Sequence, residues 1–173
     1  MHLLRQHWMF DAADGTRIDD VSLATERDAD LCAIAVVYRY LQRYCARFAD
    51  DATLRQVALY STFWVARSLP NDSATATYLP MSVRLQDMVS KLAMVREDPA
   101  DPPDPNAALP ETLQRMPYLQ SCFVKCENAF LRLHPNEKSM RTELMAAIEN
   151  GTLNRVVETW DELSHMVRDP GER

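Results

Sequence analysis

The sequence predicts an all-α fold, a compact multi-helix domain with no β-sheet. Apolar residues recur at steps of three and four along most of the chain, which is the spacing of one face of a helix. Only three of the 173 residues are glycine, and half of the ten prolines fall between positions 99 and 110. Apolar residues make up 47% of the chain and charged residues 25%, a composition typical of one globular domain.

Residues 1–28 carry the weakest pattern. Four residues predict a short amphipathic helix near the start: Leu3, Leu4, His7 and Trp8. Gly15 interrupts this pattern, and the apolar residues after it indicate another turn or two before residue 29. The stretch lacks the apolar core and the small-residue cleavage site of a secretory signal. We therefore expect an intracellular protein, nuclear or cytoplasmic and not secreted.

Residues 29–48 predict the first long helix, because an apolar row continues along them without Gly or Pro. The row consists of Leu31, Ile34, Tyr38, Leu41, Cys45 and Phe48. Asp50 and Asp51 have side chains that cap helices well, so a second helix is expected to begin there. Its predicted inward face consists of Leu54, Val57, Ala58, Ser61, Trp64 and Val65. Pro70 and the polar residues after it end this helix.

A third helix is expected after Pro80, with one face formed by Leu85, Met88, Val89 and Leu92. Residues 97–110 combine five prolines with acidic residues, which predicts an extended, exposed loop. Pro117 suits the first turn of the next helix. The predicted inward face of that helix consists of Leu119, Phe123, Cys126, Phe130 and Leu133.

Residues 134–173 predict two further helices and a frayed tail. The first is expected to end at Asn150 and Gly151, residues that commonly follow a helix C-terminus. Its apolar positions are Met140, Leu144 and Ile148. The apolar positions of the second are Leu153, Val156, Val157, Trp160, Leu163 and Val167. The tail after Arg168 is expected to fray.

Composition disfavours several classes of function. The formal net charge of −6 argues against direct binding of nucleic acid, which needs basic stripes that neutralise phosphates. Phosphate-binding loops need several glycines in a short span, and no Gly-x-Ser-x-Gly nucleophile turn occurs. No apolar run approaches the roughly 18 residues of a membrane span. We therefore expect a protein that is not an enzyme, holds no cofactor and works by binding another protein.

Cys122, Cys126 and His134 come nearest to a metal site. The two cysteines are four residues apart and share one side of a helix. Zinc needs four converging ligands, however, and the sequence offers no fourth. The acidic residues of 97–110 lack the glycine turn and the final Glu of a calcium-binding EF-hand loop. Buried structural thiols are therefore the favoured interpretation, and no metal site is predicted.

Two segments resemble the cyclin box family. Residues 33–48 (AIAVVYRYLQRYCARF) are similar to the family's second helix and end on Tyr40, Leu41, Gln42, Arg43, Tyr44, Ala46, Arg47 and Phe48. Residues 116–133 (MPYLQSCFVKCENAFLRL) are similar to its fifth helix through Pro117, Tyr118, Cys126, Glu127, Leu131 and Leu133. Between them, residues 61–66 resemble the third helix and residues 82–92 the fourth. The resemblance spans residues 29–133 and is nearest to transcriptional cyclins of the C and H kind.

The resemblance implies a cyclin-like helical bundle that binds and positions a cyclin-dependent kinase. In kinase-activating cyclins, a Lys at the end of the third helix and a Glu in the fifth hold the kinase's regulatory helix. Glu127 matches that Glu, whereas Ser68 falls on the Lys position with Arg67 beside it. The expected apolar neighbours on this kinase-facing surface are Phe63, Tyr118, Leu119 and Phe123.

The replaced Lys leaves a second hypothesis open. The chain then serves as a cyclin-fold scaffold in a larger nuclear or transcription complex and binds no kinase, since a fold does not fix a function. A helical adaptor unrelated to cyclins is a third hypothesis. Residues 139–168 match only the first two helices of a second cyclin box, so a single divergent box is expected.

Overall fold

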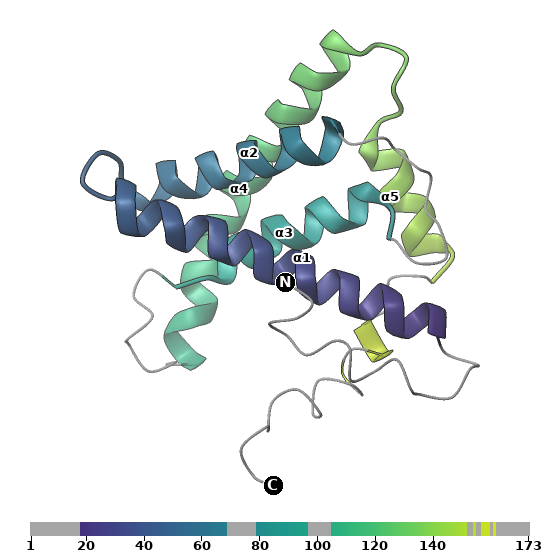
Figure 1. The fold of residues 1–173 in the computed structure, drawn as a ribbon, viewed down its shortest axis with the longest axis horizontal. Coiled ribbons are helices and arrows are strands. Elements are labelled where there is room, and N and C mark those ends of the chain that lie inside the picture. The colour runs from purple at the N-terminus through teal and green to yellow at the C-terminus, as the bar shows by residue number, and fades with distance from the viewer. Residues whose placement is uncertain are drawn as a thin grey trace, which may run out of the picture.

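The computed structural model describes residues 18–68, 79–96, 105–151, 154, 157–159 and 161. These residues are helices and the turns between them, and no strand occurs among them (Figure 1). The helices are α1 Ile18–Cys45, α2 Asp51–Ser68, α3 Met81–Met94, α4 Pro105–Leu133 and α5 Met140–Glu149. The predicted all-α multi-helix fold is therefore confirmed for the described part of the chain.

Helices α1 and α2 form an antiparallel pair joined by a short turn (Figure 1). The carboxylate of Asp50 accepts a hydrogen bond from the backbone N–H of Thr53 at 2.8 Å, which caps α2 as predicted. The first helix begins at Ile18, so the expected boundary between residues 28 and 29 is wrong. Leu23 and Ala24 explain the longer helix, since both are buried against α3 and α5. The short helix predicted near residues 3–8 lies outside the described residues.

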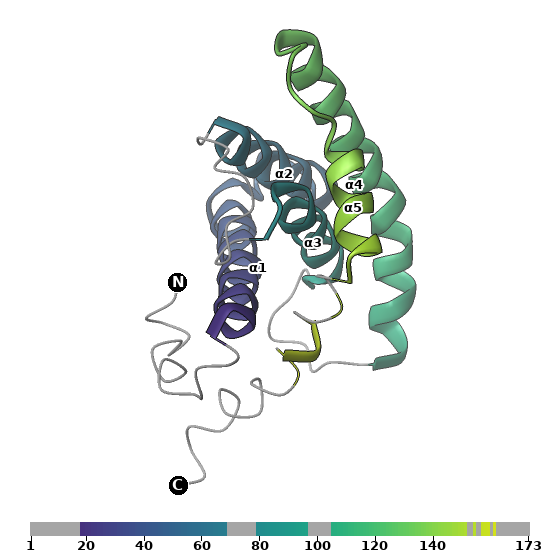
Figure 2. The same cartoon turned by 90° about the vertical axis from the view of Figure 1, so that its right-hand side faces the viewer.

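Helix α3 occupies the centre of the domain and contacts each of the other four helices. Figure 2 shows it between the α1–α2 pair and the side formed by α4 and α5. The start after Pro80 is confirmed. Its buried residues are Ser82, Val83, Leu85, Met88, Val89, Leu92 and Ala93, which include the four that were predicted.

Helix α4 begins at Pro105, twelve positions before the expected start at Pro117. The predicted loop is therefore wrong over residues 105–110, and its remainder lies outside the described residues. A proline at the first helical position costs little, because its missing N–H would have no partner there. Pro117 lies in the helix interior on an exposed position, where water can reach the carbonyl that its missing N–H leaves unbonded.

Helix α5 agrees with the prediction at both ends. The Ser139 hydroxyl accepts a hydrogen bond from the backbone N–H of Arg141 and caps its start. Gly151 follows the end with a φ of 71°, a left-handed conformation that glycine adopts without a steric penalty. Residues 154, 157–159 and 161 are helical, and the rest of the last predicted helix and the tail lie outside the described residues.

The main core lies where α1, α2, α3 and α4 meet, and Met140 of α5 joins it. Several residues predicted to face inward are instead exposed: Phe48, Val57, Ser61, Val65, Leu133 and Ile148. Phe48 lies beyond the end of α1, and Leu133 is the last residue of α4. The buried residues of α2 are Leu54, Arg55, Ala58, Leu59 and Phe63, so this helix is turned away from its predicted orientation.

Candidate functional site

A hydrogen-bonded network around Arg55 holds the start of α2 in place. The side chain of Arg55 is 1% exposed. Its Nε donates to the carboxylate of Asp51 at 2.6 Å, and the guanidinium also donates to the hydroxyl of Tyr38 at 2.9 Å and to the backbone carbonyl of Leu92. The Tyr38 hydroxyl in turn donates to Asp51. One buried cation thus joins α1, α2 and α3.

The electrostatics of this network keep Asp51 ionised. Burial alone would raise the pKa of Asp51, but the hydrogen bonds from Arg55 and Tyr38 and the nearby positive charges outweigh it. The pKa of this carboxyl therefore lies below its usual value. Burial, together with the hydrogen bond to Asp51, raises the pKa of Tyr38 well above its usual value. The network therefore holds one positive and one negative charge at neutral pH.

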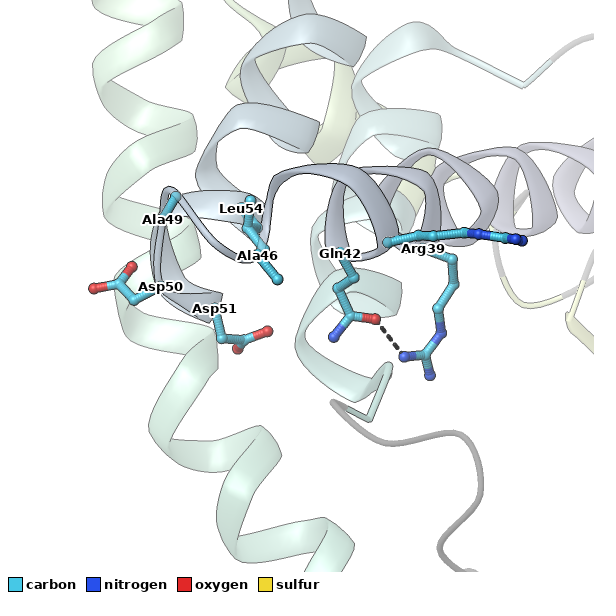
Figure 3. Close-up of a pocket in the computed structure, with 8 residues that line it drawn as sticks. Arg39, Gln42, Ala46, Ala49, Asp50, Asp51 and Leu54 are labelled. Atoms are coloured by element: carbon cyan, nitrogen blue, oxygen red, sulfur yellow. Dashed lines mark hydrogen bonds between the residues drawn. The ribbon is translucent and has the colours of Figure 1, made fainter.

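An open groove of about 540 Å³ lies above this network, between the last turns of α1 and the first turn of α2 (Figure 3). Its lining residues are Arg39, Gln42, Arg43, Ala46, Ala49, Asp50, Asp51 and Leu54. Both carboxylates in the lining are engaged in structure, since Asp50 caps α2 and Asp51 pairs with Arg55. The charged side chains that line the groove can therefore orient a polar ligand. Neither carboxylate in the lining is free to transfer a proton.

Beside the groove, α1 and the turn after it expose large apolar side chains. We call Val36, Val37, Tyr40, Arg43, Tyr44, Arg47 and Phe48 the α1 outer face. Tyr40 is 62% exposed and Phe48 is 74% exposed. The rings of Tyr40 and Tyr44 lie 4.7 Å apart. The guanidinium groups of Arg43 and Arg47 lie over Tyr44 and Phe48, at 5.6 and 4.5 Å from the ring centroids.

The predicted site residues do not include the α1 outer face, although the sequence carries a signal for it. In residues 39–48, an Arg followed by an aromatic residue recurs every four positions. Side chains four apart lie on the same face of a helix, so this spacing indicates one continuous surface. Ile34 and Tyr38 form a separate row that is buried. One helix thus has an apolar row in the core and another in solvent.

Three of the predicted kinase-facing residues lie in the core. Phe63 and Leu119 are fully buried and Phe123 is 8% exposed, so their assignment to a partner surface is wrong. The ring of Phe63 contacts those of Phe123 and Phe130 edge to face, at 5.9 and 6.3 Å. Tyr118 is partly exposed, and its hydroxyl donates to the side-chain oxygen of Gln56 at 2.7 Å. Of the four apolar positions, only Tyr118 reaches the surface.

Glu127 caps a helix of its own chain. One oxygen of its carboxylate accepts a hydrogen bond from the Ser139 hydroxyl at 2.9 Å and another from the backbone N–H of Met140 at 2.7 Å. The carboxylate thus binds the first turn of α5, where the helix dipole favours a negative charge. This explains the residue without a partner protein.

Arg67 and Ser68 also have contacts within the chain. The side chain of Arg67 is 4% exposed, and its guanidinium lies 4.2 Å from the centroid of the Phe130 ring and 3.9 Å from Glu137. The Ser68 hydroxyl is exposed and donates to the carbonyl of Trp64 at 2.7 Å. Among the described residues, the contacts of Arg67 and those of Glu127 involve different partners, and the two side chains do not form one anchor. Arg67 and Glu127 therefore both already make contacts within the chain, close to the turn that joins α4 to α5.

The burial predicted for Cys122 and Cys126 is confirmed, and all four cysteines are free. Burial, and then the neighbouring Cys122, raises the pKa of Cys126 to about 11, so this thiol stays protonated at neutral pH. His134 stacks on Phe130 with ring centroids 4.4 Å apart. Within the described ranges, no three His, Cys, Asp or Glu side chains gather as a metal site requires.

None of the described helices combines the length and the apolar composition needed to cross a bilayer. The chain matches no protein-family model, no curated protein and no solved structure.

Proposed function

We propose that this chain is a non-catalytic, cyclin-like regulatory subunit that binds and positions a cyclin-dependent kinase, with transcription control as its setting. The order of the helices supports this proposal. The four segments that resemble the second to fifth cyclin helices fall, in that order, on α1, α2, α3 and α4. Such a subunit acts by offering a preformed surface that favours one conformation of its partner.

The observation that carries a binding function is the α1 outer face. Contiguous exposed apolar side chains are uncommon on monomeric soluble proteins and mark interaction sites. Tyr and Arg are the residue types enriched where interfaces bind most tightly, and this surface contains two of each. The kinase-binding surface therefore includes α1, rather than only the ends of α2 and α4.

The test is purification of the tagged full chain from its native source, followed by identification of the proteins that co-elute and a kinase assay. The proposal predicts a cyclin-dependent kinase in stoichiometric amount, with higher kinase activity when the chain is present. A matched control is the same chain carrying Tyr40→Ala and Tyr44→Ala, checked for an unchanged melting temperature. Absence of any kinase from the wild-type sample contradicts the proposal.

The cyclin-fold scaffold is the second candidate, because Glu127 and Arg67 make contacts within their own chain. A scaffold predicts a stable multi-protein assembly without a kinase in the same purification. Glu127→Ala then affects the assembly only as far as it lowers the stability of the chain itself. The unrelated helical adaptor predicts a single protein partner of another class.

A further inference from the structure

The α1 outer face consists of two parallel rows of side chains. Val36, Tyr40, Tyr44 and Phe48 are spaced four residues apart and form an apolar row, which Val37 widens. Arg43 and Arg47 form a basic row beside it. Because residues four apart lie one turn above each other on a helix, Val36, Tyr40 and Tyr44 share one side of α1. The turn after Cys45 carries Arg47 and Phe48.

The rings of the apolar row already contact other side chains of the α1 outer face. Tyr40 and Tyr44 contact each other, and Arg43 and Arg47 lie over the next ring in the row. Side chains that are already ordered lose less conformational entropy when they are buried, so a larger part of the contact energy appears as affinity. The surface therefore suits a rigid apolar partner that lies along the helix.

The charge of the basic row indicates the charge of the partner. No carboxylate among the described residues pairs with Arg43 or Arg47, although the whole chain has a formal net charge of −6. These two cations are exposed beside the apolar row, so an acidic partner that packs on this row also gains attraction from them. Electrostatic complementarity of this kind fixes the site and the orientation of a partner.

We propose that the α1 outer face binds an amphipathic helix of a partner protein, with an apolar stripe flanked by Glu or Asp. The inference rests on the proposed binding function and names the surface and the partner chemistry for it. The apolar stripe packs on the row that contains Tyr40 and Tyr44, and the acidic flank faces Arg43 and Arg47. Single-stranded nucleic acid fits less well, since the two valines offer no stacking ring and the net charge repels phosphates.

The probe is a fluorescent helical peptide of about 18 residues, or five turns, with leucines on one stripe and Glu on both flanks. A second peptide differs only in having Lys in place of Glu. Anisotropy titration of the full chain should give an affinity for the Glu peptide at least about tenfold higher than for the Lys peptide. Equal affinities, or no binding of the Glu peptide, overturn the proposal.

Charge reversal supplies the decisive variant. The chain with Arg43→Glu and Arg47→Glu should lose at least about tenfold in affinity for the Glu peptide and bind the Lys peptide better than wild type does. The matched control reverses two exposed arginines far along the chain, Arg132→Glu and Arg141→Glu, and should leave both affinities unchanged. All these positions are exposed, so melting temperatures should agree with that of wild type.

Other occupants of the surface give different results. Competition by a single-stranded oligonucleotide at lower concentration than the Glu peptide would mean a nucleic-acid site. A concentration-dependent dimer that Tyr40→Ala and Tyr44→Ala abolish would mean a second copy of the chain. If the kinase co-purifies equally with the charge-reversed chain, this inference fails and the proposed function stands. If the peptides behave as expected but no kinase co-purifies, the proposed function fails and the docking surface stands.

Discussion

Arg55 is almost completely buried, and each of its side-chain nitrogens has a hydrogen-bond acceptor. Its neighbours are a carboxylate, a hydroxyl and a helix carbonyl, so each of its three nitrogens donates to an oxygen. Burying an arginine is tolerated only when its charge and donors are satisfied in this way. The ring of Tyr38 adds a cation–π contact, with the guanidinium carbon 4.4 Å from the ring centroid.

The first prediction tests this pairing with two adjacent carboxylates. Asp51→Asn leaves the charge of Arg55 buried without a counter-charge, so we expect the free energy of unfolding to fall by about 3 kcal/mol at pH 7. Asp50→Asn is the control, because Asp50 is exposed and Asn caps a helix as well as Asp does. Urea unfolding followed by circular dichroism measures both. Equal stability of the two variants would contradict the role given to Asp51.

The same variant predicts a pH dependence. The pKa of Asp51 is lowered in the folded state, so its contribution is fully present above the unfolded pKa of about 4. That contribution is lost as the pH falls through the lower folded pKa, because the folded carboxylate must then be protonated. The stability difference between wild type and Asp51→Asn should therefore shrink as the pH falls from about 5 towards 3.

A second prediction concerns Glu127. Glu127→Ala removes the acceptor for two hydrogen bonds at the start of α5, so we expect a loss of about 1–2 kcal/mol in the free energy of unfolding. Glu127→Gln keeps a side-chain oxygen and should lose less. Glu149→Ala is the control, since Glu149 is exposed at the opposite end of α5. Wild-type melting of Glu127→Ala, with loss of a kinase partner, would mean that Glu127 contacts the kinase and does not stabilise α5.

At the scale of elements, the start of α3 and both ends of α5 were predictable because their signals are local. Each signal affects the backbone within one turn of its own residue, as at Pro80, Ser139 and Gly151. The orientation of α2 was not predictable, because its apolar residues surround the helix. Leu54 and Ala58 are buried in either orientation. The observed orientation also buries Arg55, whose partners Tyr38 and Leu92 lie on α1 and α3.

The prolines misled the prediction of α4 for a related reason. Proline strongly disfavours a helix interior when only local terms are considered. Here the helix continues through Pro117 because Leu119 and Phe123, both within the next two turns, are buried in the core. The role of Glu127 was less predictable than the helix ends, because it was assigned from the family resemblance alone. Its carboxylate accepts hydrogen bonds from Ser139 and Met140, which are distant in sequence and come close only in the fold.

The third prediction tests the orientation of α2 with two aliphatic residues. Leu59 is fully buried, so Leu59→Asp places an unpaired charge in the core and should prevent folding. Val65 is 64% exposed, so Val65→Asp should change the free energy of unfolding by no more than about 0.5 kcal/mol. Circular dichroism and thermal melting of both variants provide the measurement. The reverse order of stability would mean that α2 has the orientation expected from the sequence.

At the scale of the whole molecule, α3 is the element on which the other helices depend. It contacts each of α1, α2, α4 and α5, and its buried residues belong to both hydrophobic clusters. The clusters share this helix, so neither can lose its packing while α3 keeps all of its own. This arrangement favours one cooperative unit over two separable halves.

The fourth prediction follows from that arrangement. Urea unfolding measured by far-ultraviolet circular dichroism, which reports helix content, should share its midpoint with near-ultraviolet circular dichroism, which reports packing of the aromatic rings. Val89 is fully buried on α3, so Val89→Ala should move both midpoints together to lower urea. Two separated midpoints would show that part of the chain unfolds independently.

The Arg55 network also has a consequence for the order of events during folding. Asp51 and Arg55 are one turn apart and can pair as soon as α2 is helical, whereas Leu92 is 37 positions from Arg55 along the chain. We expect the ion pair to form first, so that a neutralised pair enters the core when α3 docks. An arginine without its carboxylate would have to shed its hydration in the transition state. Asp51→Asn should therefore mainly slow refolding in stopped-flow measurements, with little change in the unfolding rate.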